Sequence, residues 1–339
     1  MTRTTLPAAL ASACLVAAAA CGGTAPPPTS DDRRPPTATT SAVADSDVAG
    51  DVPPELAPAL AGTPERPRSA AQAADMVAAA QRVIRSDAPA ADLLAAAGHT
   101  AQLAVREIAA RPRWTRQVLR DLRPGERAWV RDSVAARREF RSMHPTSAAD
   151  LADVLPAWRI VAPAPARTLM RSYREAERRF GVDWEYLAAI NLVETAFGRI
   201  RGTSVAGAQG PMQFIPTTWD IYGAGGDIDD PHDAILAAGR LLSANGFARD
   251  KGAALWRYNN SWAYVRGVTA HARAMQRDPR QLHGYLAWEV YYLTRLGGVW
   301  LPERGRRSKW IRLAGSSASG TSMKRMAWPV PGSRIMHSS

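Results

Sequence analysis

Cysteine is nearly absent from this chain of 339 residues. The two cysteines, Cys14 and Cys21, both lie close to the N-terminus. If a leader that ends near residue 21 is removed, the rest of the chain has no pair of thiols with which to close a disulfide. The folded part must therefore be stabilised by the packing of its side chains.

Long apolar runs and strand-like alternation are also scarce. The apolar run at residues 6–20 has 15 residues, whereas a helix that spans a bilayer needs about 20. Further along the chain, apolar side chains recur at helical spacing. We expect an all-α protein, with helices over residues 70–84, 90–110, 127–141, 169–180, 231–244, 262–276 and 284–296. Asp183 is the expected N-cap of the helix that carries Glu194.

Acidic residues are fewer than basic ones, because the chain has 31 acidic residues and 43 basic residues, nearly all of them arginine. A net charge of +12 would suit a nucleic-acid-binding protein. The chain lacks a motif that reads a nucleic-acid groove, and its first residues indicate export. We therefore expect no nucleic-acid partner, and attribute the charge to anionic wall polymers or lipid headgroups.

The N-terminus has the organisation of an export signal. Arg3 supplies the positive charge, residues 6–20 supply the apolar region, and Ala18-Ala19-Ala20-Cys21-Gly22 follows. This end resembles the lipobox of bacterial lipoproteins, although Ala18 replaces the commoner leucine. The resemblance implies a lipid on Cys21 that holds an exported protein at the membrane, facing the cell wall. The alternative is cleavage at an Ala-x-Ala site, in which case Cys21 is incidental.

Composition divides the remaining chain into four parts. Residues 22–68 are rich in Pro, Thr, Ser, Ala and Asp and have few bulky apolar side chains, so we expect a disordered tether. Residues 69–160 form an N-terminal helical region, which serves either as a scaffold or as a contact for the wall or a partner. Residues 163–300 form the second helical unit. Residues 304–339 are expected to be a basic, disordered tail.

Glu194 is the first candidate for chemistry. It follows an apolar helical run, and Leu187, Ile190 and Glu194 are spaced so that they share one helix face. Burial and the negative end of the helix dipole both favour the neutral acid, which is the state needed to give a proton to a leaving oxygen. The alternative is a structural glutamate that holds the helix end.

The segment after Glu194 contains Gly198, Gly202, Gly207 and Gly210. So many glycines let a backbone approach a ligand closely. Three separated blocks here resemble the motifs of lytic transglycosylases and goose-type lysozymes, with further similarity to membrane-bound B-type lytic transglycosylases after Gly210. The blocks are Glu194-Thr195-Ala196-Phe197-Gly198, Ser204-Val205-Ala206-Gly207-Ala208-Gln209-Gly210-Pro211-Met212-Gln213 and Tyr258-Asn259. Thr195 and the pair Asn260-Ser261 depart from the family pattern.

The resemblance implies a lysozyme-like catalytic domain that cuts the β-1,4 bond between N-acetylmuramic acid and N-acetylglucosamine in peptidoglycan. Glu194 would be the single general acid and base, and the product would carry a 1,6-anhydromuramyl end. Family position assigns substrate binding to Ser204, Met212, Gln213, Tyr258 and Asn259. Met212 and Tyr258 could instead be core residues. The alternative functions are a hydrolytic muramidase of the same fold and a non-catalytic wall lipoprotein that binds glycan.

Other catalytic groups are hard to find in the sequence. A second catalytic carboxylate could come only from Asp220 or from the acidic residues 227–230, and the latter better suit the start of a helix. The six histidines are scattered without the spacing of a metal site. We therefore expect no metal and no cofactor, and the sequence names no protein partner.

Overall fold

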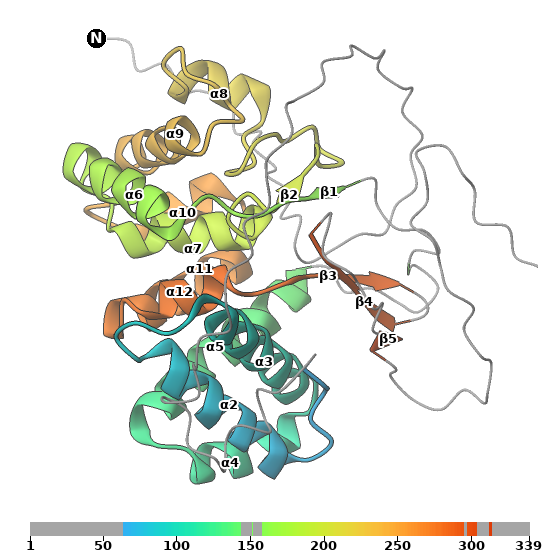
Figure 1. The fold of residues 1–339 in the computed structure, drawn as a ribbon. Coiled ribbons are helices and arrows are strands. Elements are labelled where there is room, and N and C mark those ends of the chain that lie inside the picture. Colours follow the sequence, from blue (N-terminus) through green and yellow to red (C-terminus); the bar gives the residue numbers. More distant parts are fainter. Residues whose placement is uncertain (1–63, 144–150, 152–157, 295–296, 304–311, 314–339) are drawn as a thin grey trace, which may run out of the picture.

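The computed structural model describes residues 64–143, 151, 158–294, 297–303 and 312–313. The expected signal peptide, including Cys21, lies outside the described residues, as does nearly all of the expected tether and tail. The described chain is mainly helical, as the sequence predicts (Figure 1). Among the described helices, none combines the length and the apolar character that crossing a membrane requires.

Four helices form the described part of the N-terminal region. They are α2 (Ala70–Ile84), α3 (Ala91–Ala110), α4 (Pro112–Asp121) and α5 (Pro124–Met143). The hydroxyl of Ser69 accepts a hydrogen bond from the backbone N–H of Gln72 and so caps α2. The expected helices over 70–84, 90–110 and 127–141 are confirmed, whereas α4 was not expected.

The second half of the chain adds seven helices within the described residues. They are α6 (Ala166–Phe180), α7 (Trp184–Thr195), α8 (Pro216–Tyr222), α9 (Pro231–Ala244), α10 (Lys251–Tyr258), α11 (Trp262–Arg277) and α12 (Gln281–Leu286). Gly181 ends α6 in the left-handed conformation, with φ of 66°. Asp183 precedes α7, but its side chain pairs with Lys251 and forms no capping hydrogen bond.

The expected last helix over residues 284–296 is wrong. Within the described residues of this segment, the short helix α12 ends at Leu286 and is followed by an antiparallel hairpin of β3 (Val290–Thr294) and β4 (Gly297–Leu301). Val290 to Thr294 are β-branched, aromatic or leucine residues whose burial alternates, which suits a strand. β5 (Arg312–Leu313), within the expected tail, pairs with β4. A separate antiparallel pair is formed by β1 (Arg159–Ile160), which precedes α6 in the sequence, and β2 (Ile200–Arg201), which follows α7.

The N-terminal helices and the second half share one hydrophobic core, which runs from Ala70 to Leu286. In Figure 1, α11 and α12 lie between α2–α5 and the helices α6–α10. Polar pairs cross this contact: the side-chain amides of Gln81 and Gln281 bond each other in both directions, at 3.1 and 2.8 Å. The N-terminal region is therefore packed onto the helices that follow the proposed motifs, as a scaffold would be.

Candidate active site

Glu194 lies on α7, next to the last residue of that helix. Leu187 and Ile190, on the same helix face, are fully buried, and Glu194 itself has no exposed surface. The sequence-based expectation that this face is buried is confirmed. One turn earlier, the Asn191 amide donates to the Tyr173 hydroxyl at 2.8 Å, and burial raises the pKa of Tyr173.

The backbone turns sharply after Glu194. Ala196, Phe197 and Gly198 all have positive φ, at 51°, 63° and 77°, although only glycine adopts this region without strain. The hydroxyl of Thr195 accepts from the N–H of Gly198 at 2.8 Å and donates to the carbonyl of Pro211 at 2.6 Å. Thr195 thus links the end of α7 to the second motif block. Both hydrogen bonds need only a hydroxyl group, which threonine supplies as well as serine does.

The loop that receives this bond is also tightly constrained. Gly210 has φ of 71°, and a Cβ at this position would lie 1.9 Å from the carbonyl oxygen of Ile228. Gln213 also has positive φ, and its side-chain amide donates to the carbonyl of Gly210 at 2.9 Å. Met212 and Gln213 are buried. These contacts constrain the loop, which the bond from Thr195 to Pro211 holds beside the turn that follows Glu194.

Tyr264, on the first turn of α11, provides the contact to Glu194 that the sequence analysis missed. Its hydroxyl donates a hydrogen bond to Oε1 of Glu194 at 2.8 Å, and its ring is fully buried. Ser261 caps α11 by accepting from the backbone N–H of Tyr264. The apolar spacing predicts a helix over residues 262–276, and no local signal shows that α11 packs against α7 at this point.

Tyr258 lies beside Tyr264, and their rings are nearly parallel, 6.3 Å apart between centroids. The hydroxyl of Tyr258 donates to the carbonyl of Met212 at 2.7 Å. Tyr258 is thus part of the constellation that includes Glu194, Tyr264 and Met212. The described bond to Met212 gives its hydroxyl a role in holding the second motif block.

Ser204 and Asn259, the remaining predicted substrate contacts, are both buried. The hydroxyl of Ser204 accepts from the backbone N–H of Ala208 at 2.9 Å and so closes the turn that opens the second motif block. Asn259 ends α10 directly after Tyr258. Ser204 thus has a local structural task in the described structure.

The other acidic residues that sequence analysis considered are exposed. Asp230 caps α9, accepting from the backbone N–H groups of His232 and Asp233 at 2.8 and 3.1 Å, and Asp227 accepts from the N–H of Asp229. This is the acidic helix start that the sequence predicts. Asp227 and Asp230 thus hold backbone donors at the start of α9, and no described hydrogen bond joins either carboxylate to Glu194.

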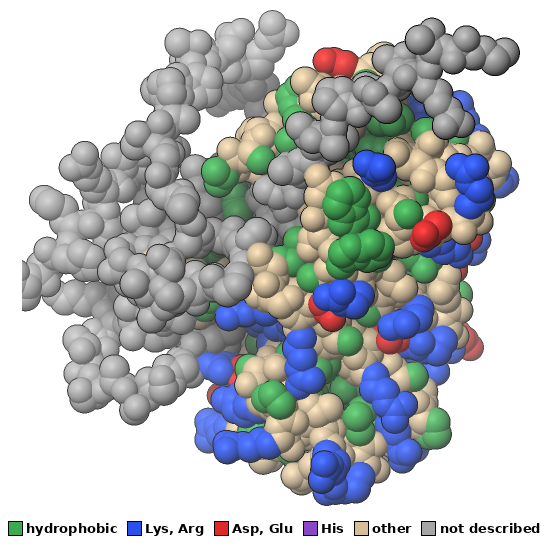
Figure 2. Space-filling view, turned by 180° about the vertical axis from the view of Figure 1, so that it is seen from behind, with side chains coloured by type: hydrophobic (Ala, Val, Ile, Leu, Met, Phe, Trp, Pro, Cys, Tyr) green, Lys and Arg blue, Asp and Glu red, His purple; other side chains and the backbone are tan. Residues whose placement is uncertain are grey.

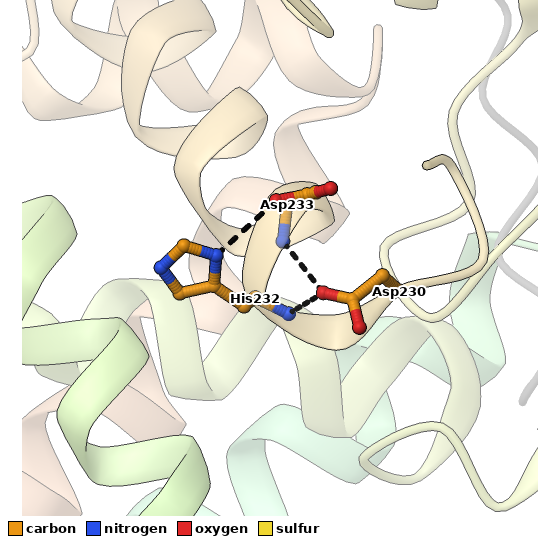
Figure 3. Close-up of side chains that lie close together, drawn as sticks. All are labelled: Asp230, His232 and Asp233. Atoms are coloured by element: carbon orange, nitrogen blue, oxygen red, sulfur yellow. Dashed lines mark hydrogen bonds and ion pairs between the residues drawn. The ribbon is translucent and has the colours of Figure 1, made fainter. Parts of the chain in front are cut away.

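Among the described residues, Asp230, His232 and Asp233 also form a group whose side chains are of the types that bind metal ions. One ligand atom from each lies within 4.8 Å of the others (Figure 3). The imidazole of His232 contacts Asp233 on one side and Glu175 at 3.1 Å on the other, and the bond to Glu175 raises the pKa of His232. The bond from the N–H of Asp227 lowers the pKa of Asp233. These contacts account for the cluster as a helix cap and a small ion-pair network.

The constellation around Glu194 thus consists of a buried carboxyl, a phenol that donates to it, and two tightly turned loops. A carboxyl in such a place can donate a proton and, once charged, is stabilised by the phenol. Comparison of the chain with protein-family models, with curated proteins and with solved structures finds no match.

Proposed function

We propose that this protein is a peptidoglycan lytic transglycosylase in which Glu194 is the single general acid and base. The observation that carries the proposal is the hydrogen bond from Tyr264 to Glu194, at the junction of the first two motif blocks. The third block adds Tyr258, which packs on Tyr264 and bonds to Met212. A lysozyme-like fold for residues 163–300 belongs to the same proposal and is supported by the helical character of that segment.

The reaction needs one carboxyl that acts twice. Glu194 first gives its proton to the glycosidic oxygen as the bond from that oxygen to the muramyl carbon breaks, while the 2-acetamido oxygen of the sugar supports the positive carbon. The carboxylate of Glu194, bonded by Tyr264, then takes the proton from the 6-hydroxyl of the same sugar as its oxygen attacks that carbon. The attack is intramolecular, so the tethered hydroxyl has a large effective concentration.

The burial of Glu194 sets a condition on this mechanism. Because the carboxyl has no exposed surface, the residues over it must move before a glycosidic oxygen can reach it. Proton transfer requires a heavy-atom distance of about 3 Å or one bridging water. A transglycosylase must also keep free water from the positive carbon, and a site that opens only for a glycan strand meets both requirements.

The same burial favours a second candidate function. In a non-catalytic wall lipoprotein that binds glycan, Glu194 and Tyr264 would form a structural hydrogen bond that fixes α7 against α11. This protein would bind glycan strands and release no product. The third alternative, a hydrolytic muramidase, would use the same constellation with water in place of the 6-hydroxyl.

Product analysis on purified sacculi distinguishes the three functions. The full chain is incubated with sacculi, and the released fragments are examined by mass spectrometry, with Glu194→Gln as the matched control. We expect anhydromuramyl ends from the wild type and none from Glu194→Gln, because an amide has the shape of the carboxyl but does not deliver a proton. Reducing ends would indicate the muramidase, and absence of any product would indicate the non-catalytic protein.

Attachment to the membrane through a lipid on Cys21 completes the proposal, with peptidoglycan strands as the partner on the outer side. The support is the lipobox-like sequence and the apolar run of residues 6–20, which is too short to span a bilayer. Cys21→Ser is expected to move the protein from the membrane fraction to the soluble fraction. Unchanged fractionation would refute lipidation at Cys21.

A further inference from the structure

The basic charge of this protein is spread widely, so charge alone does not locate a binding site. Figure 2 shows Lys and Arg side chains distributed over both the upper and the lower part of the viewed face. A site for an anion must therefore be found from the way in which particular arginines are placed. Arg159 on β1 and Arg201 on β2 lie directly opposite each other in the antiparallel pairing of these strands. We call these two residues the arginine pair.

The ribbon that β1 and β2 form has two different faces (Figure 1). Ile160 and Ile200, which are also directly opposite each other, are buried in a small hydrophobic cluster that includes Tyr292 of the β3–β4 hairpin. Successive side chains of a strand point to opposite faces. The arginine pair therefore lies on the other face of the ribbon, where Arg159 is exposed and Arg201 is half-buried.

The two positive charges of the arginine pair repel each other. Directly opposite residues of an antiparallel pair have Cβ atoms about 4.5 to 5.5 Å apart, and like charges in these positions are destabilising. Within the described residues, neither Arg159 nor Arg201 forms an ion pair with a carboxylate that would offset the repulsion. Nη1 of Arg201 donates to Asp229 at 3.2 Å, but the acceptor is the backbone carbonyl. An anion bound by both guanidinium groups would remove the repulsion.

The arginine pair also lies beside the residues that position Glu194. β2 follows the sharp turn after this residue, and a Cβ at Gly198 in the turn would lie 4.0 Å from Nη2 of Arg201. The same Cβ would lie 3.3 Å from Cβ of Pro211, in the second motif block. The guanidinium of Arg201 is therefore next to the junction of the first two motif blocks.

We propose that the arginine pair binds a carboxylate carried by the muramyl unit of a glycan strand. This inference rests on the proposed function and deepens it, because the sugar backbone of peptidoglycan is neutral and its carboxylates are attached through the lactyl group of the muramyl sugar. A guanidinium is a planar fork of N–H donors that matches the two oxygens of a carboxylate. The carboxylate belongs either to the stem peptide or to a lactyl group from which the peptide has been removed. Its capture would place the muramyl sugar beside Glu194.

Binding to three soluble ligands tests the arginine pair without cleavage. The full chain carries Glu194→Gln in every protein, so that no strand is cut, and calorimetric titration gives the Kd. The ligands are glycan strands with stem peptides, the same strands after an amidase has removed the peptides, and a chitin oligosaccharide, which has no carboxylate. Arg159→Gln/Arg201→Gln removes the pair, and Arg167→Gln/Arg171→Gln is the matched control, since it removes the same charge from exposed positions on α6.

We expect the control to bind all three ligands with the Kd of its parent. The arginine-pair variant should bind the carboxylate-bearing strands about tenfold more weakly and the chitin oligosaccharide equally well. A loss confined to the peptide-bearing strands identifies the stem peptide as the source of the carboxylate, and a loss confined to the stripped strands identifies the lactyl group. Unchanged binding to both kinds of strand, or an equal loss for the chitin oligosaccharide, would overturn the proposal.

The single variant Arg159→Gln separates binding from folding. It removes the repulsion and leaves the bond from Arg201 to Asp229 in place, so the melting temperature should not fall while the binding of strands weakens. A lower melting temperature with unchanged binding would show that Arg159 has a structural role and would refute the carboxylate site.

Cleavage of sacculi keeps this inference distinct from the proposed function. If the protein with native Glu194 releases no product, but strand binding depends on the arginine pair, only the proposed activity fails. If this protein cleaves sacculi and the arginine-pair variant binds and cleaves as well as its parent, only the carboxylate site fails. Absence of both binding and cleavage would contradict both.

Discussion

At the residue scale, two buried tyrosines beside Glu194 differ in what their hydroxyl groups bind. The hydroxyl of Tyr264 donates to the carboxyl of Glu194, whereas the hydroxyl of Tyr258 donates to the backbone of Met212. Their rings stack on each other, and both are buried. The pair is therefore a matched test, because removal of either hydroxyl deletes a described buried hydrogen bond of similar length, 2.8 Å for Tyr264 and 2.7 Å for Tyr258.

We expect Tyr264→Phe to lower turnover at least about tenfold, since the developing carboxylate of Glu194 loses the hydrogen bond that Tyr264 donates. The alkaline limb of the pH–rate profile should move to higher pH for the same reason. Tyr258→Phe should instead lower the free energy of unfolding by about 1 to 3 kcal/mol, because a buried carbonyl is left without its donor. Initial rates on sacculi and thermal unfolding measure both effects. Identical behaviour of the two variants would contradict the assignment.

At the element scale, the contact between α5 and α11 links the N-terminal region to Glu194. Phe140 of α5 packs over Gly267 of α11, where a Cβ would lie 2.4 Å from the ring, and the same ring meets Tyr264 edge to face. Since Tyr264 holds Glu194, the packing of α5 fixes one of the donors of the constellation. This packing favours the scaffold role over a wall or partner contact for the N-terminal region.

We expect Gly267→Ala to destabilise the protein by about 1 to 3 kcal/mol, because the added methyl group pushes α5 away from α11. Activity should fall with it. Gly252→Ala in α10 is the control, since its Cβ would meet nothing closer than 3.3 Å. Phe140→Leu in the Gly267→Ala background should recover part of the lost stability. A Gly267→Ala protein as stable as the wild type would show that the two helices separate without cost.

The sequence predicts elements whose signals are local. The bounds of α2 and α9 agree with expectation because Ser69 and Asp230 cap their starts and the apolar spacing is regular. The hairpin of β3 and β4 was missed because an apolar run of five residues fits a helix equally well until its partner strand is known. Tyr264 was missed for a similar reason: its partner Glu194 is 70 residues away in the sequence.

At the scale of the whole molecule, two buried histidines couple folding to pH. His271 packs against Phe140, Tyr285 and Trp288, where the two halves of the core meet, and burial lowers its pKa to about 3. Burial lowers the pKa of His99 to about 4. Both are neutral in the folded state and take up protons on unfolding below about pH 6.5. The unfolded state binds more protons there, so stability falls as pH falls.

We expect each of these histidines to reduce the free energy of unfolding by about 2 kcal/mol between pH 7 and pH 5. The exposed pair of His232 and Glu175 acts in the opposite direction, because its bond raises the pKa of His232. Denaturant unfolding across this pH range measures the slope, and His271→Gln should flatten it. A wild-type protein equally stable at pH 7 and pH 5 would contradict the neutral, buried state of both histidines.

The central claim is that Glu194 directs a 6-hydroxyl, and not water, to the cleaved bond. Digestion of sacculi in water enriched in heavy oxygen, followed by mass spectrometry of the new muramyl ends, tests it most directly. We expect anhydro ends that carry no heavy oxygen, formed by the wild type and not by Glu194→Gln. Reducing ends that carry one heavy oxygen would show that water, and not the 6-hydroxyl, is the nucleophile.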